Sequence, residues 1–159
     1  MLNIVFVCTG NICRSPMAEG LLRYKWREMR RDDLIVSSMG IHGLNGSPAT
    51  EYAQAVCEQN GFDISSHIAR SLVGEELHQA NLILCMEPGH KKFVQTFFPW
   101  HRAVVFLLGA WPEKETRKSS IADPMGGSYE KYQRIFSIIQ NHIERIIPLL
   151  IKNSGFSLD

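Results

Sequence analysis

Short hydrophobic runs alternate with amphipathic segments along this chain. The runs are rich in β-branched and aliphatic side chains, and Gly10 and Gly40 follow two of them as turn residues. Apolar runs of this length are typical of strands that a parallel sheet buries on both faces. The pattern predicts strands at residues 2–8, 34–38, 81–86 and 103–107.

The segments between these runs carry apolar residues at helical spacing. They predict helices at residues 15–31, 49–59, 74–79, 87–97 and 128–151. Pro16 lies near the start of the first helix, where proline is favoured, and Asn60-Gly61 is a stop signal after the second. Pro148 should kink or fray the end of the last helix, because proline lacks the amide hydrogen that an α-helix needs.

Strands that alternate with helices predict an α/β fold, a single open four-stranded parallel sheet with helices on both faces. No repeat or linker interrupts residues 1–159, so one domain is expected. Ligands of such sheets bind at the carboxyl ends of the strands. Residues 109–127 have no periodic pattern, and a segment of that length favours a functional loop over a simple connector.

Composition narrows the class of protein. The 159 residues are 45% hydrophobic and 21% charged, which is typical of a globular chain and excludes a disordered one. A formal net charge of +1 argues against a general binder of nucleic acids or membrane surfaces, but allows a local anion site. No apolar run is long enough to span a membrane, and no basic leader opens the chain. A cytoplasmic protein with reduced cysteines is therefore expected, without a metal or cofactor because no metal-ligand spacing occurs.

The loop after the first predicted strand carries the chemistry. Cys8 and Arg14 enclose five residues, a length that can curl so that backbone N–H groups point inward and form a nest for a tetrahedral oxyanion. A thiol at the base of that nest is favoured as the thiolate, the nucleophilic form. Arg14 can donate two parallel N–H bonds to phosphate oxygens, and the Ser15 hydroxyl can stabilise the sulfur.

The order of residues 7–19 resembles the low-molecular-weight protein tyrosine phosphatases, and the likeness extends beyond a bare C-x5-R. Ser38 matches a serine of the family's second strand, and residues 61–70 and 82–87 match two further family patterns. The resemblance implies the phosphotyrosine phosphatase I-like fold and hydrolysis of phosphotyrosine proteins without a metal. It also implies a set of phosphate-binding residues in the loop, namely Thr9, Gly10, Asn11, Ile12, Cys13 and Ser15.

The mechanism that the resemblance implies has two steps. Cys8 attacks phosphorus while Asp123 protonates the leaving phenolate oxygen, and a water activated by the same carboxylate then hydrolyses the phosphocysteine. Arg14 and the loop amides bind the equatorial oxygens throughout. Pro124 restricts the backbone of Asp123 and helps to aim its carboxyl group.

Two positions depart from the family's usual pattern at the predicted substrate cleft. Met125 follows Asp-Pro where the family usually has an aromatic residue, so stacking on the substrate ring and tyrosine phosphorylation are both lost at this position. Leu44 stands where the family often has an aromatic wall. An aliphatic residue there resembles bacterial members that work opposite tyrosine autokinases of polysaccharide export. A monomer is expected, with a weak dimer as the alternative.

Several polar residues near the loop allow more than one interpretation. Asn11 and Ser38 are interpreted as supports of the loop rather than exposed polar residues, and Asn tolerates the left-handed backbone that such a loop needs. The family's counterpart of His67 supports the loop, although a catalytic base is the alternative. The family's counterpart of Cys13 can form a reversible disulfide with the nucleophile, here Cys8, and an inert small loop residue is the alternative.

Two other functions are compatible with parts of this pattern. A thioredoxin-coupled arsenate reductase shares the fold and loop but needs two further cysteines. Cys85 is near the first of these places, whereas residues 86–99 contain no cysteine. A non-catalytic phosphate-binding module is expected to lack the nucleophile or the acid, and both are present. Cys57 and Cys85 are predicted to lie in the core.

Overall fold

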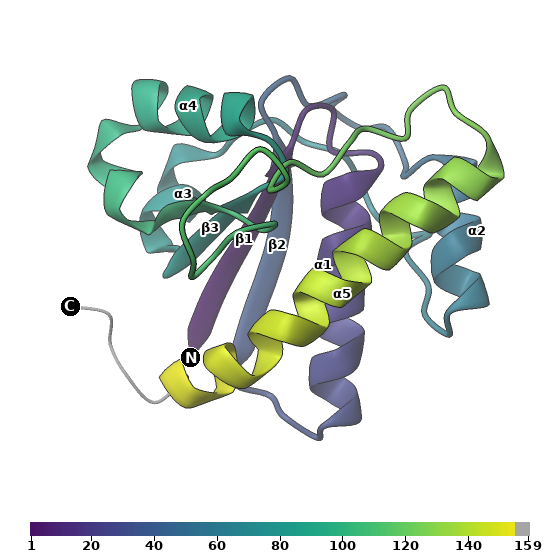
Figure 1. Ribbon diagram of the computed structural model, residues 1–159, viewed down its shortest axis with the longest axis horizontal. Helices are drawn as coiled ribbons and strands as arrows, with labels where there is room; N and C mark the ends of the chain where they lie inside the picture. Colours follow the sequence, from purple (N-terminus) through teal and green to yellow (C-terminus); the bar gives the residue numbers. More distant parts are fainter. Residues whose placement is uncertain (155–159) are drawn as a thin grey trace.

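Four parallel strands form the sheet at the centre of the computed structural model, which describes residues 1–154 except for the side chains of residues 101–103 (Figure 1). The strands are β1 (Leu2–Cys8), β2 (Leu34–Gly40), β3 (Leu82–Cys85) and β4 (Val105–Leu107), in the spatial order β2-β1-β3-β4. All three pairings are parallel. The predicted open, four-stranded parallel sheet is confirmed.

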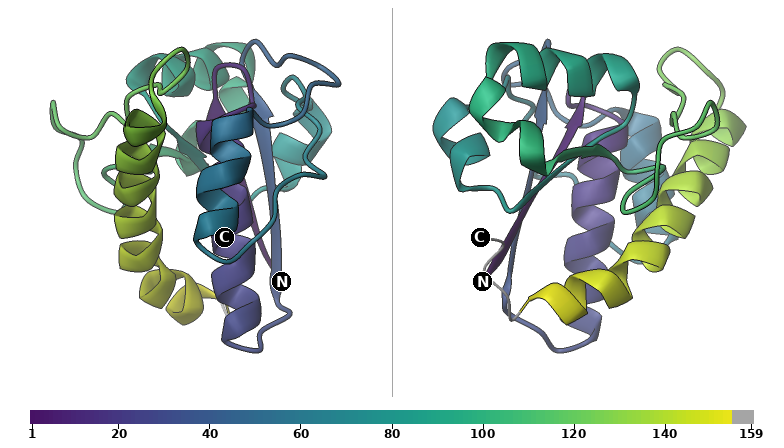
Figure 2. Two further views of the ribbon diagram at one scale, coloured as in Figure 1. Left: turned by 90° about the vertical axis from the view of Figure 1, so that its right-hand side faces the viewer. Right: turned by 60° about the vertical axis from the view of Figure 1, so that its left-hand side comes forward.

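Helices cover both faces of this sheet (Figures 1 and 2). Ile4 and Phe6 of β1 belong to one hydrophobic cluster, with α1 (Arg14–Glu28), α2 (Glu51–Gln59) and α5 (Tyr129–Asn153). Val5 and Val7 point to the other face, because side chains alternate along a strand, and they pack with α3 (Gly74–Gln79) and α4 (Pro88–Phe97). The prediction of helices on both faces is therefore also confirmed.

Several predicted boundaries were wrong by a few residues. The first helix was expected at residues 15–31, but α1 ends at Glu28 because Arg30 takes a positive φ of 56° and turns the chain. The second strand was expected to end at Ser38, whereas β2 continues to Gly40, which lies opposite Cys8 in the register.

The fourth strand was also predicted too long. It was expected at residues 103–107, but a 3-10 helix, η1 (Pro99–Val104), occupies its first part. The third strand was expected at residues 81–86 and covers Leu82–Cys85. Three helices begin one or two residues late, because Thr50, Glu87 and Ser128 serve as their caps rather than as helical residues.

The last helix crosses α1 and remains helical through Pro148 to Asn153 (Figure 2). Its ribbon bends near the C-terminal end, as the proline predicts. Residues 109–127 contain no helix or strand, as expected for a long loop. Within residues 1–154, no helix has the length and apolar character to cross a membrane.

Candidate active site

The loop at residues 9–13 connects the carboxyl end of β1 to α1, and its peptide groups are consistently oriented. The five carbonyl groups of residues 8–12 all accept hydrogen bonds from outside the loop, at 2.6 to 3.0 Å. The donors are the amides of Ile41, His42, Leu44 and Thr50 and the Nε2 of His67. The amide N–H groups of residues 9–13, by contrast, donate to no acceptor within the described part of the chain. Carbonyls that face outward and free amides that face inward make a concave anion nest.

Asn11 fixes this curvature from beneath the loop. Its backbone is left-handed, with φ of 60°, and its side chain is fully buried. The side-chain amide donates to the hydroxyls of Ser15 at 2.8 Å and Ser38 at 2.9 Å, and its oxygen accepts from the amide of Arg70 at 3.0 Å. The structure thus brings Asn11, Ser38 and His67 together under the loop, outside the cavity above it.

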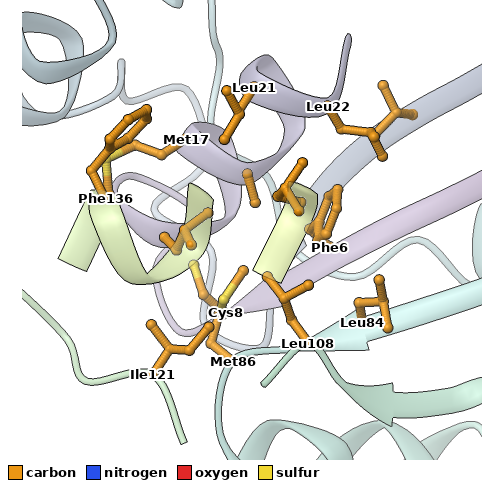
Figure 3. Close-up of a cluster of buried hydrophobic side chains, with 14 of the residues drawn as sticks. Phe6, Cys8, Met17, Leu21, Leu22, Leu84, Met86, Leu108, Ile121 and Phe136 are labelled. Carbon is orange, nitrogen blue, oxygen red and sulfur yellow. The ribbon is translucent and has the colours of Figure 1, made fainter. Parts of the chain in front are cut away.

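Cys8 lies at the bottom of the nest and is only 2% exposed. Apolar side chains, among them Met86, Leu108 and Ile121, surround its inner side (Figure 3). Its Sγ lies 2.9 Å from Ser15 Oγ. Because that hydroxyl accepts from the amide of Asn11, its own proton is available to donate to the sulfur.

Arg14 is the first residue of α1 and is almost completely buried, with 1% of its surface exposed. A buried guanidinium needs acceptors, and Nη1 donates to Glu87 Oε2 at 2.7 Å and to the carbonyl of Ile121 at 2.8 Å. Nη2 lies 3.6 Å from Asp123 Oδ2 and 3.5 Å from Thr9 Oγ1. One edge of the guanidinium is therefore held by the protein, and Nη2 is directed toward the site.

A cavity of about 290 Å³ opens above the loop, and Asp123 stands at its side. Asp123 Oδ1 accepts from the amide of Met125 at 3.0 Å, and its side chain is 46% exposed. The residues that line the cavity come from the loop, from the segment after β2 and from the segment before α5; they are Cys8, Thr9, Gly10, Ile12, Cys13, Arg14, His42, Leu44, Asp123 and Met125. Every predicted substrate-binding residue lines this cavity except Asn11 and Ser15. The side chains of those two residues lie beneath the loop, where they are hydrogen-bonded to each other.

Cys13 has its thiol turned away from solvent. Its Sγ lies 3.3 Å from the hydroxyl of Tyr132 and 3.6 Å from that of Thr50, and burial raises its pKa. All four cysteines are free thiols. Cys57 and Cys85 are fully buried, as predicted for core residues, and burial raises the pKa of Cys57 to about 12.

Two polar residues beside the loop were not predicted to take part in the site. Glu87, which pairs with Arg14, and His90, which contacts Thr9, both follow β3. Their position at the carboxyl end of a central strand is the signal that could have identified them. Burial and the charge of Arg14 lower the pKa of His90 to about 4. In the described residues, no cluster of His, Cys, Asp or Glu has the arrangement of a metal site.

This chain is similar to known proteins in sequence and fold. The family model described as "Low molecular weight phosphotyrosine protein phosphatase" matches residues 3–154. The low molecular weight protein-tyrosine-phosphatase Ptp of Acinetobacter johnsonii is 43% identical over 122 residues, which are 77% of this chain and 79% of that protein. A protein-arginine-phosphatase of Geobacillus stearothermophilus is 34% identical over 147 residues, 92% of this chain and 95% of that one.

A solved structure shows the same fold. The low molecular weight protein tyrosine phosphatase from T. tengcongensis superposes with a TM-score of 0.88 at 33% identity, covering 94% of this chain and 100% of that chain. The match of the family model over nearly the whole chain, the sequence identities and the shared fold lead to one assignment. The chain belongs to the low molecular weight phosphotyrosine protein phosphatases, a family of hydrolases.

Proposed function

We propose that this protein hydrolyses phosphotyrosine in proteins through a phosphocysteine at Cys8. The observation that carries the proposal is the ring of unpaired amides at residues 9–13 above a buried thiol. Free backbone N–H groups bind a dianionic phosphoryl group without any rearrangement of the loop. Arg14 and Asp123 complete the site at the positions where charge changes during phosphoryl transfer.

In the first step, the Cys8 thiolate attacks phosphorus in line with the leaving group. The S–P bond forms as the P–O bond to tyrosine breaks, and the protonated Asp123 donates its proton to the phenolate oxygen. Arg14 and the loop amides hold the three non-bridging oxygens as their charge redistributes.

In the second step, a water attacks the phosphocysteine. Asp123, now a carboxylate, takes a proton from this water, the P–S bond breaks, and inorganic phosphate leaves. The sulfur departs with its electron pair, and the Ser15 hydroxyl, 2.9 Å away, stabilises the thiolate. The acid of the first step is thereby restored for the next turnover.

The cavity walls favour tyrosine over arginine as the residue that carries the phosphoryl group. Ile12, Leu44 and Met125 give the cavity apolar walls, which suit a phenyl ring. Phosphoarginine would bring additional N–H donors that need acceptors. Among the described residues that line the cavity, Asp123 is the one carboxylate.

The test is steady-state hydrolysis of p-nitrophenyl phosphate, a phosphotyrosine peptide and a matched phosphoarginine peptide, with EDTA present. We expect turnover of the first two substrates, a strong preference for phosphotyrosine over phosphoarginine, and no turnover by Cys8→Ser. A preference for phosphoarginine would contradict the tyrosine assignment. Full activity of Cys8→Ser would contradict the mechanism.

The role of Asp123 makes a separate prediction. Asp123→Ala should lower kcat roughly 10²-fold or more on a phenyl phosphate with a poor leaving group, because general acid catalysis then supplies much of the rate. The loss should be much smaller on p-nitrophenyl phosphate, whose leaving group needs less protonation. Equal losses on both substrates would exclude Asp123 as the general acid.

We also propose substrates and a regulatory chemistry for the same site. The exposed aliphatic side chain of Leu44 at the cavity mouth supports a bacterial tyrosine autokinase as a physiological substrate.

Cys13 supports reversible protection of Cys8 by a disulfide between the two residues, and a thiol reductant would be required to reduce that disulfide. Peroxide treatment should inactivate the enzyme, and a thiol reductant should restore it.

A further inference from the structure

The side-chain hydroxyl of Thr9 contacts two polar side chains, His90 and Arg14, that lie outside the loop. Its Oγ1 lies 2.8 Å from Nε2 of His90 and 3.5 Å from Nη2 of Arg14, and Thr9 lines the cavity above Cys8. A threonine hydroxyl has one proton to donate and two lone pairs that accept. The directions of these two contacts therefore decide where its proton can go.

The tautomer of His90 fixes the first direction. The amide of Glu87 donates to Nδ1 of His90 at 3.1 Å, so Nδ1 carries no proton. The neutral ring then has its proton on Nε2, and it must donate that proton to Thr9, the nearest partner. Glu87 Oε2 is farther from the same nitrogen, at 3.5 Å. Burial keeps the pKa of His90 low, at about 4, so the neutral ring persists at neutral pH.

Arg14 fixes the second direction, because a guanidinium can only donate. Both contacts of Thr9 Oγ1 are thus accepted hydrogen bonds, and its own proton has no acceptor among the described residues. The hydroxyl lies beside the guanidinium edge that is directed toward the site. Its proton is left to point to whatever oxyanion occupies the cavity.

We propose that the Thr9 hydroxyl donates a hydrogen bond to a non-bridging oxygen of the bound phosphoryl group, and that His90 is the residue that positions it. This inference rests on the proposed function, in that the cavity must accept a phosphoryl group. It adds a side-chain donor to the backbone amides of the loop. It also gives a role to α4, which carries His90 and packs on the face of the sheet opposite α1.

The test measures binding of inorganic phosphate and of phenylphosphonate, which need no turnover. Thr9→Val removes the hydroxyl while keeping the shape, and it should weaken binding roughly 10-fold, as expected for loss of a hydrogen bond to a charged group. Thr9→Ser should bind like the wild type. Thr96→Val is the matched control, since Thr96 is an exposed residue of α4 whose hydroxyl donates to the carbonyl of Lys92.

The positioning role of His90 is tested by combining variants. His90→Leu should weaken phosphate binding, and His90→Gln, whose amide can both accept from Glu87 and donate to Thr9, should restore most of it. In the Thr9→Val background, His90→Leu should have little further effect, because the residue through which it acts is gone.

Two results would overturn the inference. One is unchanged phosphate affinity in folded Thr9→Val, and the other is an undiminished effect of His90→Leu in the Thr9→Val background. Turnover by the wild-type enzyme is measured in parallel and tests the proposed function separately. If the wild-type protein bound phosphate but hydrolysed no phosphotyrosine peptide, the proposed function would be contradicted. The phosphate affinities of the Thr9 and His90 variants could still be compared with that of the wild type.

Discussion

Among single residues, Asn11 determines the shape of the loop although its side chain does not line the cavity. Its left-handed backbone turns the loop, while its side chain connects Ser15, Ser38 and the amide of Arg70. Asparagine is one of the few side chains that tolerate this conformation and can also bond on both sides. Its two functions can be separated by substitution.

Asn11→Gly removes the side-chain hydrogen bonds and tolerates the left-handed backbone, whereas Asn11→Ala removes the same hydrogen bonds and also strains that backbone. We expect both variants to lose kcat/KM, and we expect Asn11→Ala to unfold with about 1 kcal/mol less free energy than Asn11→Gly. Urea unfolding and steady-state kinetics measure the two effects. Equal stability of the two variants would mean that the positive φ imposes no strain.

At the scale of elements, β2 supports the loop by allowing the backbone to approach very closely. A Cβ on Gly40 would lie 2.4 Å from the carbonyl oxygen of Thr9 and 3.0 Å from the amide of Asn11. Both contacts are with backbone, which cannot move aside without distorting the nest. The end of β2 therefore helps to fix the loop, although Gly40 does not line the cavity above it.

Gly40→Ala should destabilise the protein by about 1–3 kcal/mol and lower activity strongly, because overpacking here displaces the loop. Gly89→Ala is the control: it lies in α4, has no atom within 4 Å of the added methyl, and should be neutral or slightly stabilising. Thermal unfolding and kcat/KM of both variants give the comparison. A fully active Gly40→Ala would contradict the close approach.

At the scale of the whole molecule, the two faces of the sheet contribute different parts of the site. The loop leads into α1, which begins at Arg14 and packs on one face, whereas Glu87 and His90 lie at the start of α4 on the other face. His90 is 3% exposed and is surrounded by the charges of Arg14, Glu87 and Asp123. The site thus carries a buried histidine whose pKa is lowered by burial and by the charge of Arg14, so its protonation is expected to oppose folding.

Stability should therefore fall in acid through His90. Its pKa is about 4 when folded and about 6.5 when unfolded, so between these values the unfolded state binds more protons. Protonation of His90 in the unfolded state should lower the free energy of unfolding by about 2 kcal/mol as the pH falls from 7 to 5. Above pH 7 this effect should be small. Urea unfolding at both pH values should show a smaller acid loss for His90→Gln. An equal loss in both proteins would contradict a depressed pKa.

The sequence predicted some of these features and not others, for physical reasons. Residues 2–8 and the helix after them were recognisable because hydrophobic periodicity and the neighbouring loop motif are local signals. The pairs Arg14–Glu87, Thr9–His90 and Cys13–Tyr132 were not, because packing brings together residues 73 to 119 positions apart. Boundaries such as that of β4 also depended on η1, whose proline-initiated turn has no periodic pattern.

The proposed mechanism depends on transfer of the phosphoryl group to Cys8 during turnover. The most direct measurement quenches the enzyme in acid while it hydrolyses a phosphotyrosine peptide and then determines by mass spectrometry which residue is phosphorylated. We expect a phosphorylated Cys8 in the wild type. During turnover of p-nitrophenyl phosphate, a larger fraction of Cys8 should be phosphorylated in Asp123→Ala, because the second step needs the carboxylate as a base. Turnover without any phosphorylated Cys8 in either protein would contradict the proposed mechanism.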